Sequence, residues 1–361
     1  MTTNTNPATQ ESRGLNRHLK TLLLFVLAIL LFWWFGRGLN WAEVRNSLSH
    51  ADLKYLAVAI LTVSLTYLLR AYRWQALLKP LTSASLRDLF IANVVGFSAF
   101  FLVGRAGEVV RPALLPMRDR NIRPAASFAT ILVERICDFA AVVLLFAVNL
   151  AWFRAPAGQE ADFSYVREIG LILLGGTLAG LTILFFFARK SDQLIRLLDR
   201  SVSNWRAPLQ RPGRILISML DQLGKALQVL AYPREFVVVS LWTALLWFII
   251  VLSNILIIRA FGVEFGFRET IFMLGFALVG SLIPTPGGSA GAFHAAAAAG
   301  LIFLGVKREL AAAISILVHL VDFGPALAFA LYYLIRGDVT LSRLRTFRPT
   351  ETSTIANQVY S

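Results

Sequence analysis

The sequence is poor in cysteine, histidine and charge. Its 361 residues include one cysteine and four histidines, and only 16% are charged, whereas 57% are hydrophobic. A single cysteine, Cys137, excludes an intrachain disulfide, and its place in an apolar run predicts inert packing. The low charge and positive mean hydropathy exclude an ordinary soluble domain. The sequence predicts an all-α polytopic membrane protein, because several apolar runs are long enough to span a bilayer.

Motifs for nucleotide, metal or hydrolytic chemistry are also missing. The sequence contains no Walker loop, dinucleotide fingerprint, zinc-hydrolase helix or nucleophile elbow. We therefore assign no catalytic residue, no metal and no cofactor, and we expect no coupling to ATP within this chain.

The basic residues are placed as in a membrane protein. A formal net charge of +14 would suggest nucleic-acid binding in a soluble chain. Here most Lys and Arg residues lie in segments beside the apolar runs, namely 13–20, 70–87, 105–123, 189–234 and 336–348. Cytoplasmic loops that face anionic lipid have this pattern. We expect no nucleic-acid partner, both termini in the cytoplasm, and a place in the plasma (inner) membrane of a bacterium.

The charge pattern also predicts the topology. All basic segments face the cytoplasm only if residues 89–103 and 271–305 each enter and leave on one face, as re-entrant hairpins. Six full crossings and two hairpins then account for the eight apolar segments, at about 19–35, 53–69, 89–103, 125–150, 169–188, 236–258, 271–305 and 310–335.

One transmembrane domain is expected, over residues 13–340, between a disordered tail at 1–12 and a cytoplasmic tail at 341–361. Its first half covers 13–152, and its second half covers 169–188 and 235–340. The basic segment 189–234 has apolar residues at helical spacing. It predicts one or two amphipathic helices on the inner leaflet, broken near Pro208 and Pro212, or else a solvated loop.

An internal repeat relates the two halves. Adding 184 to a residue number maps Gly104-x-x-Gly107 onto Gly288-x-x-Gly291, and "RICDFAAVVLLF" from Arg135 onto "HLVDFGPALAFA" from His319. Each half has three crossings, an odd number, so the halves must be inverted relative to each other. Inverted repeats with broken segments are typical of transporters.

Charged residues inside the apolar segments are the candidate site. In "GRAGEVVRPALL", two glycines permit a turn, and the arginines beside it suit a phosphate or form an interfacial ion pair. "ERICD" places charges inside a crossing, where they must be paired or face a wet cavity, as a site or as a structural clamp. In "IPTPGGSAGAFH", the prolines and glycines break a helix whose N-terminus would attract an anion.

Histidines contribute to the same region. His294 follows the second break, and His319 lies three residues before Asp322 in the last crossing. Their spacing matches no compact metal motif; a proton-titrating pair or a headgroup contact is the alternative. The residues of "RAYRWQALLKP" (Arg70, Arg73, Trp74 and Lys79) are interpreted as an interfacial anchor, which is compatible with contact to a lipid phosphate.

The chain resembles a known family at these motifs, the lysylphosphatidylglycerol synthase transmembrane-region, or flippase-like, family. "RAYRWQALLKP", "GRAGEVVRPALL", "LVERICDFAAVV" and "PTPGG" look like its signatures, in the family's order, over about residues 15–340. The resemblance implies a protein that moves aminoacylated or glycosylated lipids between leaflets or accompanies their synthesis. It implies a lipid site at Arg105, Glu108, Arg111, Glu134, Arg135 and Asp138.

Two features depart from the family. The soluble aminoacyl-transfer domain of the full-length synthases does not follow the last crossing, and His294 stands where many members have a glutamate. We therefore expect a stand-alone member, and lysyl-phosphatidylglycerol is not carried over as its substrate.

The sequence favours a flippase-like transporter over an enzyme. Its expected partner is a membrane lipid with an anionic, aminoacylated or glycosylated headgroup, bound in a polar cavity between the two hairpins. The alternatives are a membrane-embedded enzyme or a non-catalytic partner of a separate lipid-modifying enzyme. The expected headgroup-binding residues are Arg105, Glu108, Arg111, Glu134, Arg135, Asp138, Gly287, Gly288, His294, His319 and Asp322, with helix breaks at Gly104, Gly107, Pro284, Pro286 and Gly291.

Overall fold

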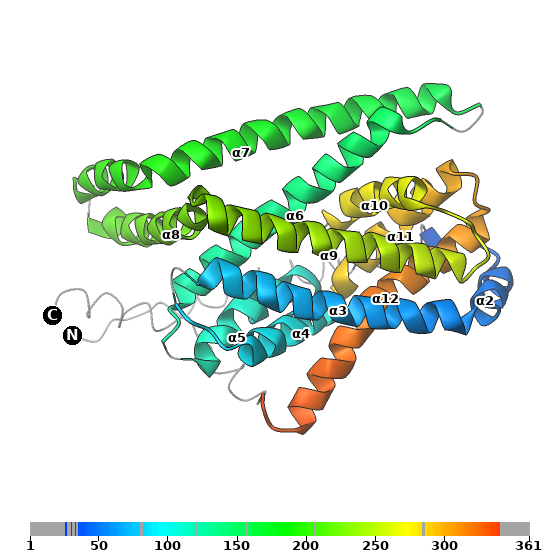
Figure 1. Cartoon of the computed structure of the whole chain (residues 1–361), viewed down its shortest axis with the longest axis horizontal. Helices are drawn as coiled ribbons and strands as arrows, with labels where there is room; N and C mark the ends of the chain where they lie inside the picture. Colours follow the sequence, from blue (N-terminus) through cyan, green and yellow to red (C-terminus); the bar gives the residue numbers. More distant parts are fainter. Residues whose placement is uncertain are drawn as a thin grey trace.

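The computed structural model describes residues 35–339, apart from 80, 81, 120, 156, 157, 205, 206, 284 and 285, together with residues 26, 30 and 33. All regular structure in this part of the chain is helical (Figure 1). The elements are α2 (Trp41–Ser49), α3 (Leu53–Leu78), α4 (Leu86–Val103), the 3₁₀ helix η1 (Gly104–Val109), α5 (Val110–Arg118), α6 (Pro124–Trp152), α7 (Glu160–Ser203), α8 (Ala207–Ala231), α9 (Pro233–Arg259), α10 (Phe267–Ser281), α11 (Pro286–Phe303) and α12 (Arg308–Ile335).

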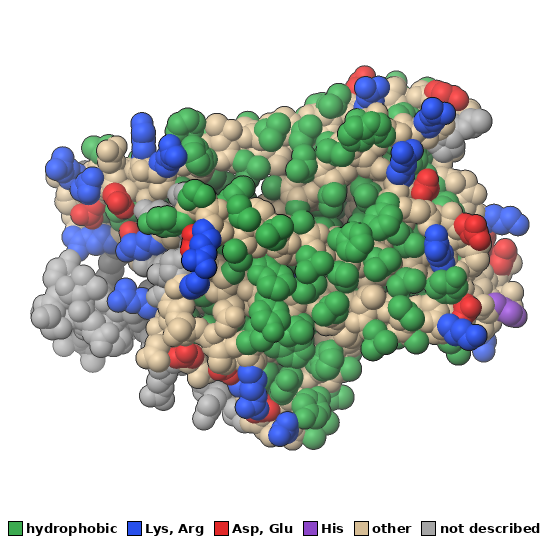
Figure 2. Space-filling view, viewed as in Figure 1, with side chains coloured by type: hydrophobic (Ala, Val, Ile, Leu, Met, Phe, Trp, Pro, Cys, Tyr) green, Lys and Arg blue, Asp and Glu red, His purple; other side chains and the backbone are tan. Residues whose placement is uncertain are grey.

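The chain is a multi-pass membrane protein. Within the described residues, five helices are long and apolar enough to cross a bilayer, namely α3, α4, α7, α9 and α12. Figure 2 shows hydrophobic side chains over the middle of the molecule, whereas charged side chains gather toward its two ends. Most of the first apolar run, 19–35, lies outside the described residues.

Local signals in the sequence set several helix starts. The side chains of Asn40, Asp52 and Ser85 accept hydrogen bonds from backbone amides in the first turns of α2, α3 and α4. Pro124 and Pro233 lie in the first turns of α6 and α9, where the missing N–H has no intrahelical partner to lose.

Residues 86–118 form a helical hairpin, which we call hairpin 1. Its two arms, α4 and α5, are antiparallel: Asp88 pairs with Arg118 at the open end, and Gly96 faces Arg111 halfway along. Gly107 packs directly on the Ala99 backbone near the tip. Gly104 ends α4 at a φ of +67°, a conformation in which a side chain would be strained.

Residues 267–303 form a second hairpin, hairpin 2, from α10 and α11. Gly280 packs on the Ala292 backbone, and Gly300 packs on Met273 and Phe276, so the two arms are again antiparallel and close. Small residues let the backbones approach, as in other helix pairs in membranes.

The two hairpins open at opposite ends of the molecule. Arg118, at the open end of hairpin 1, donates to the Asp338 carbonyl just beyond the last turn of α12. Arg268, at the open end of hairpin 2, accepts at its carbonyl from Asn149, near the end of α6. Their tips meet in the middle, because Gly288 lies against Phe100 and Phe101.

The segment 189–234 differs in part from the prediction. α7 is one continuous helix of 44 residues that joins the crossing at 169–188 to the first part of the segment. The helix break lies between Ser203 and Ala207, just before Pro208, whereas Pro212 lies inside α8. The expected break near Pro212 is therefore wrong. Pro208, the second residue of α8, loses no intrahelical bond, because the first amides have no intrahelical acceptor; Pro212, the sixth residue, removes one bond from a helix that nevertheless continues to Ala231.

The glycine contacts in hairpin 1 yield a stability prediction. Gly107→Ala is expected to destabilise the protein by about 1–3 kcal/mol, because the added Cβ would overlap the Ala99 backbone. The matched control is Gly175→Ala in α7, where a Cβ would meet nothing within 4 Å. The control should stabilise by up to about 1 kcal/mol, since Ala is the better helix former. Thermal unfolding of the purified variants measures both; equal melting temperatures would contradict the packing of the hairpin.

Candidate functional site

The candidate site is a cluster of charged side chains from α3, α5 and α6. We call it the arginine–carboxylate cluster; its members are Arg70, Arg73, Arg111, Glu134, Arg135 and Asp138. Arg70 and Arg73 lie near the end of α3, Arg111 is the second residue of α5, and the others lie along α6.

Glu134 is the centre of the cluster. It accepts two hydrogen bonds from Arg111, at 2.6 Å to Oε1 and 2.7 Å to Oε2, which is the forked geometry of a strong arginine–carboxylate pair. Arg73 Nη2 lies 3.1 Å and Arg135 Nη2 lies 3.3 Å from the same Oε1 atom. One carboxylate therefore contacts three guanidinium groups.

Asp138, one turn further along α6, forms the second forked pair. Arg73 donates to its two oxygens at 2.5 and 3.0 Å, and Arg70 lies 3.6 Å from Oδ2. Arg73 also donates to Thr243 Oγ1 on α9 at 3.4 Å. The cluster therefore joins α3 and α6 and reaches α9.

The cluster is buried and carries excess positive charge. The side chains of Arg73 and Glu134 are 0% exposed, and that of Arg111 is 4% exposed. Charges at such depth are costly unless they are paired. Four guanidinium groups face two carboxylates within the cluster and a third, Asp322 on α12, which interacts with Arg70, so the guanidinium groups still outnumber the carboxylates.

One edge of the cluster is accessible. The Arg135 side chain is 42% exposed, whereas Arg70 and Asp138 are only slightly exposed. The ring of Phe97 lies below this edge, with the guanidinium carbons of Arg70, Arg135 and Arg111 at 4.8, 5.8 and 5.9 Å from its centroid. Such contacts hold the three guanidinium groups against one ring, and Arg111 keeps its forked pair with Glu134.

The structure brings together four of the six residues expected in the first half. Arg111 and Arg135 contact Glu134, and Arg73 links Glu134 to Asp138, whereas Glu108 is exposed on η1 and makes no ion pair with them. The side chain of Arg105 lies outside the described part of the structure.

Two members of the cluster, Arg70 and Arg73, have a different role in the sequence analysis, which interprets them as part of an interfacial anchor. Arg73 and Trp74 are fully buried, so their interpretation as interfacial anchors is wrong. Trp74 donates from Nε1 to Thr130 at 3.0 Å and stacks on Arg111 at 4.4 Å. The spacing of Arg70, Arg73, Trp74 and Leu77 is that of one helical face, and this signal could have placed them toward the protein interior.

The break in hairpin 2 occurs at the glycines. Gly287, Gly288 and Ser289 all have φ between +64° and +70°. Ser289 is buried in this left-handed conformation, which costs a residue with a side chain about 1–2 kcal/mol. The expected break at Gly291 is wrong, because Gly291 is buried inside α11 just beyond the left-handed turn. Pro286 is the first residue of α11, and Pro284 lies outside the described residues.

His294 and His319 meet behind this break. Their ring centroids are 4.9 Å apart and the rings are nearly perpendicular. Nε2 of His319 lies 3.3 Å from the Gly288 carbonyl oxygen. Asp322 is linked to the first cluster, since Tyr67 on α3 donates to its carbonyl at 2.5 Å and Arg70 interacts with its carboxylate.

A chain of aromatic rings connects the two groups. Phe323 lies 5.0 Å from His319 and 6.5 Å from Phe97, measured between ring centroids. Packed aromatic rings therefore link the arginine–carboxylate cluster of the first half to the histidine pair of the second half. In the described residues, no three His, Cys, Asp or Glu side chains are placed to share a metal ion.

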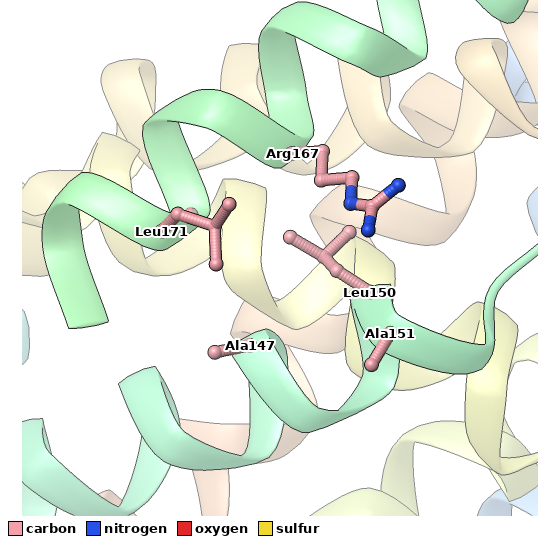
Figure 3. A pocket seen from close by; sticks show the side chains of 6 residues that line it. Ala147, Leu150, Ala151, Arg167 and Leu171 are labelled. Atoms are coloured by element: carbon pink, nitrogen blue, oxygen red, sulfur yellow. The ribbon is translucent and has the colours of Figure 1, made fainter. Parts of the chain in front are cut away.

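A small pocket lies elsewhere, between α6 and α7 (Figure 3). Its volume is about 60 Å³, and it is lined by Ala147, Leu150, Ala151, Arg167, Gly170 and Leu171. Leu150 is twelve residues beyond Asp138 on α6, about 18 Å along the helix, so the pocket is not part of the cluster.

Comparison with known proteins places these features in a family. Residues 21–330 match the family described as "Lysylphosphatidylglycerol synthase TM region". The chain is also 21% identical over 322 residues to the UPF0104 membrane protein PH1989 of Pyrococcus horikoshii, across 86% of this chain and 93% of that protein.

The central role of Glu134 yields a second stability prediction. Glu134→Gln is expected to cost about 3–5 kcal/mol, because it leaves the buried Arg111 and Arg73 without their shared carboxylate. Lys225→Gln is the control. It breaks an exposed pair with Asp221 in α8, and such pairs contribute about 0–1 kcal/mol. Melting temperatures in one detergent would compare the variants; a Glu134→Gln protein as stable as the control would contradict a paired, buried cluster.

Proposed function

Because this chain belongs to the family of the lysylphosphatidylglycerol synthase TM region, we propose that it moves a lipid with a phosphate-bearing headgroup between membrane leaflets. The observation that carries this proposal is the excess of guanidinium groups in the buried cluster. An anion is the ligand that balances this charge. The phosphate of an anionic, aminoacylated or glycosylated phospholipid supplies it, and guanidinium groups bind phosphate through two parallel hydrogen bonds.

The roles within the cluster differ. Glu134 and Asp138 hold Arg111 and Arg73 in forked pairs, so these two arginines shape the site and fix hairpin 1. Arg70 and Arg135 make only long contacts to the carboxylates, at 3.6 and 3.3 Å. They are the arginines that take up the phosphate, and Arg135 stands at the accessible edge.

The hairpins provide the passage. We propose that they are re-entrant, so that six crossings surround two broken segments whose tips meet near the midplane. Their opening at opposite ends supports this. The spacing of the elements supports it too: the first residues of α6 and α12, Pro124 and Arg308, are 184 residues apart, as are Gly104 and Gly288 at the two breaks. In this arrangement α6, with its 29 residues, is a crossing, and the two halves are inverted repeats.

The headgroup then crosses between the hairpin tips while the acyl chains stay in lipid. The Arg135 edge receives the phosphate from one leaflet. Beyond the tips, the broken start of α11 presents backbone amides at Gly287 and Gly288, which stabilise an anion on the other side. In this proposal the basic segments 70–87, 105–123 and 189–234 face the cytoplasm of a bacterial cell, and both termini are expected on the same side.

Lipid exchange tests the proposed function. The full chain is reconstituted in phosphatidylcholine vesicles with a fluorescent lipid, and a membrane-impermeant quencher reports leaflet exchange. The panel contains phosphatidylglycerol, its lysyl ester, a glycosylated phospholipid and a neutral glycolipid without phosphate. Exchange is expected for the three lipids of the panel whose headgroup contains a phosphate that can reach Arg135, and not for the neutral glycolipid. Arg135→Gln should slow it about tenfold or more, since a hydrogen bond to a charged group contributes about 1.5–3 kcal/mol.

The control for this test is Arg45→Gln, an exposed arginine on α2, which should exchange lipid at the wild-type rate. Exchange of the neutral glycolipid at an equal rate would contradict phosphate recognition. Chemical conversion of any lipid in the panel would instead indicate a membrane-embedded enzyme. A chain that neither exchanges nor converts lipid would fit a non-catalytic partner of a lipid-modifying enzyme.

Cysteine labelling tests the re-entrant hairpins. Since Cys137 is the only cysteine, Cys137→Ser provides the background for single cysteines at exposed loop positions. Cysteines at Lys79 and Asn121, which flank hairpin 1, should react with an impermeant maleimide from the same side of the membrane. Cysteines at Glu264 and Lys307, which flank hairpin 2, should both react from the opposite side. Labelling of positions 79 and 121 from different sides would show that α4 crosses.

A further inference from the structure

His294 is a buried polar side chain for which the described residues offer no hydrogen-bond partner. It is 6% exposed, and neither Nδ1 nor Nε2 has a partner among them. A neutral imidazole always carries one N–H group and one lone pair. Leaving such a group buried and unpaired costs about 1–3 kcal/mol, so its presence calls for an explanation other than stability.

The surroundings of the ring are aromatic. Phe35 and Phe293 lie 6.1 and 6.0 Å from His294, and His319 lies 4.9 Å from it, between ring centroids. His319 in turn packs on Phe101, at 5.5 Å. A phenylalanine would fill such a place without an orphaned polar group. The pair of histidines therefore suggests a need for groups that change charge.

Charged groups lie on the helices around this pair of histidines. Nearest along the same helix is Asp322, one turn from His319, and Asp322 interacts with Arg70 rather than with a ring nitrogen. The elements packed against α11 and α12 carry the following other titratable and charged residues: Lys54, Tyr55, Tyr67, Arg70, Tyr72 and Arg73 on α3, Arg87 and Asp88 on α4, Arg105 and Glu108 on η1, Arg268 and Glu269 on α10, Glu43 and Arg45 on α2, Arg234, Glu235 and Arg259 on α9, and Arg308, Glu309, Asp322, Tyr332 and Tyr333 on α12.

We propose that His294 and His319 form a binding site for one proton, and that proton binding is linked to headgroup passage; this second part rests on the proposed function. The ring nitrogen lone pair accepts the proton, and no other group need change. The site holds one proton, because two imidazolium groups with centroids 4.9 Å apart repel each other.

Electrostatics sets the sign of the linkage. The arginine–carboxylate cluster already has excess positive charge, so a nearby imidazolium is unfavourable until an anion arrives. A bound phosphate therefore favours protonation, and protonation favours the phosphate by the same factor, because linkage is reciprocal. The proton and the anionic lipid should cross together.

Contacts at the hairpin tips can transmit this change. His319 Nε2 lies 3.3 Å from the Gly288 carbonyl, and Gly288 packs on Phe100 and Phe101 of hairpin 1. An imidazolium at position 319 donates more strongly to that carbonyl than a neutral ring does. The charge of the pair therefore acts on the contact between the two hairpins.

Two variants and a matched control test the proposal. His294→Phe keeps an aromatic ring among Phe35 and Phe293, and His319→Gln keeps a donor for the Gly288 carbonyl. His50→Gln is the control, since His50 is exposed on the loop after α2. All three proteins must show the melting temperature of the wild type within a few degrees before transport is compared.

The first measurement is ring ¹⁵N NMR of histidine-labelled full chain in nanodiscs, with signals assigned by the variants. At a given acidic pH, more of the 294/319 pair should be protonated in discs of phosphatidylglycerol than in discs of a neutral glycolipid without phosphate. For Arg135→Gln in the glycolipid discs, adding phosphatidylglycerol should not raise the protonation. Failure of either ring to take up a proton between about pH 4 and 8, or equal protonation in both lipids, would overturn the proposal.

The second measurement is the leaflet distribution of labelled phosphatidylglycerol under a pH gradient of about one unit, with the membrane potential clamped at zero. One proton per lipid predicts about a tenfold excess of lipid in the more alkaline leaflet. His294→Phe and His319→Gln should exchange lipid without this excess, and His50→Gln should retain it. Wild-type exchange that ignores the gradient, or variants that still respond to it, would overturn the proposal. Absence of exchange in every condition would refute transport itself, while the NMR comparison still decides whether proton and lipid binding are linked.

Discussion

The cost of burying charge is the constraint on which the structure depends. Glu134 contacts three guanidinium groups, and each of its two neighbouring helices contributes one of them, Arg73 from α3 and Arg111 from α5. In a bilayer none of these charges is tolerated alone. The pairs therefore fix where hairpin 1 lies against the crossings. Gly96 takes part as well, since its missing side chain leaves room for Arg111.

The same constraint applies to the backbone. A helix break at membrane depth leaves amides and carbonyls that lipid cannot satisfy, so the broken segments must be buried in protein. Hairpin 2 meets this requirement through close contacts: Gly280 on Ala292, Ser289 donating to the Ser281 carbonyl, and Gly288 against the tip of hairpin 1. The left-handed turn at Gly287–Ser289 is retained despite its cost because contacts on both sides hold it in place.

The sequence predicts that the charges of α6 are paired or face a cavity and that the chain breaks at Gly104 and within residues 283–294, because charge and glycine inside an apolar run have few explanations. The structure shows the pairs and both breaks, but not the expected break at Gly291. Arg73 was misplaced because the apolar run before it ends near residue 69, whereas α3 continues to Leu78 and carries Arg73 inward. Similarly, α7 joins a predicted crossing to a predicted surface segment, since no proline interrupts it before Ser203. Patterns of hydropathy locate apolar segments well. They cannot show where a continuous helix passes from lipid into a polar interior.

The two halves of the molecule carry different charged residues at positions that the proposed repeat relates. Position 135 is an arginine and position 319, which is 184 residues later, is a histidine, while Asp138 and Asp322 occupy the next equivalent place. The first half thus holds permanent charge, because guanidinium groups stay protonated and are locked in pairs. The second half holds the imidazoles of His294 and His319, the groups to which the proposal above assigns proton binding. In the proposal above, a permanent anion site and a titratable site meet across hairpin tips that touch at Gly288, and a proton alters how strongly a phosphate is held.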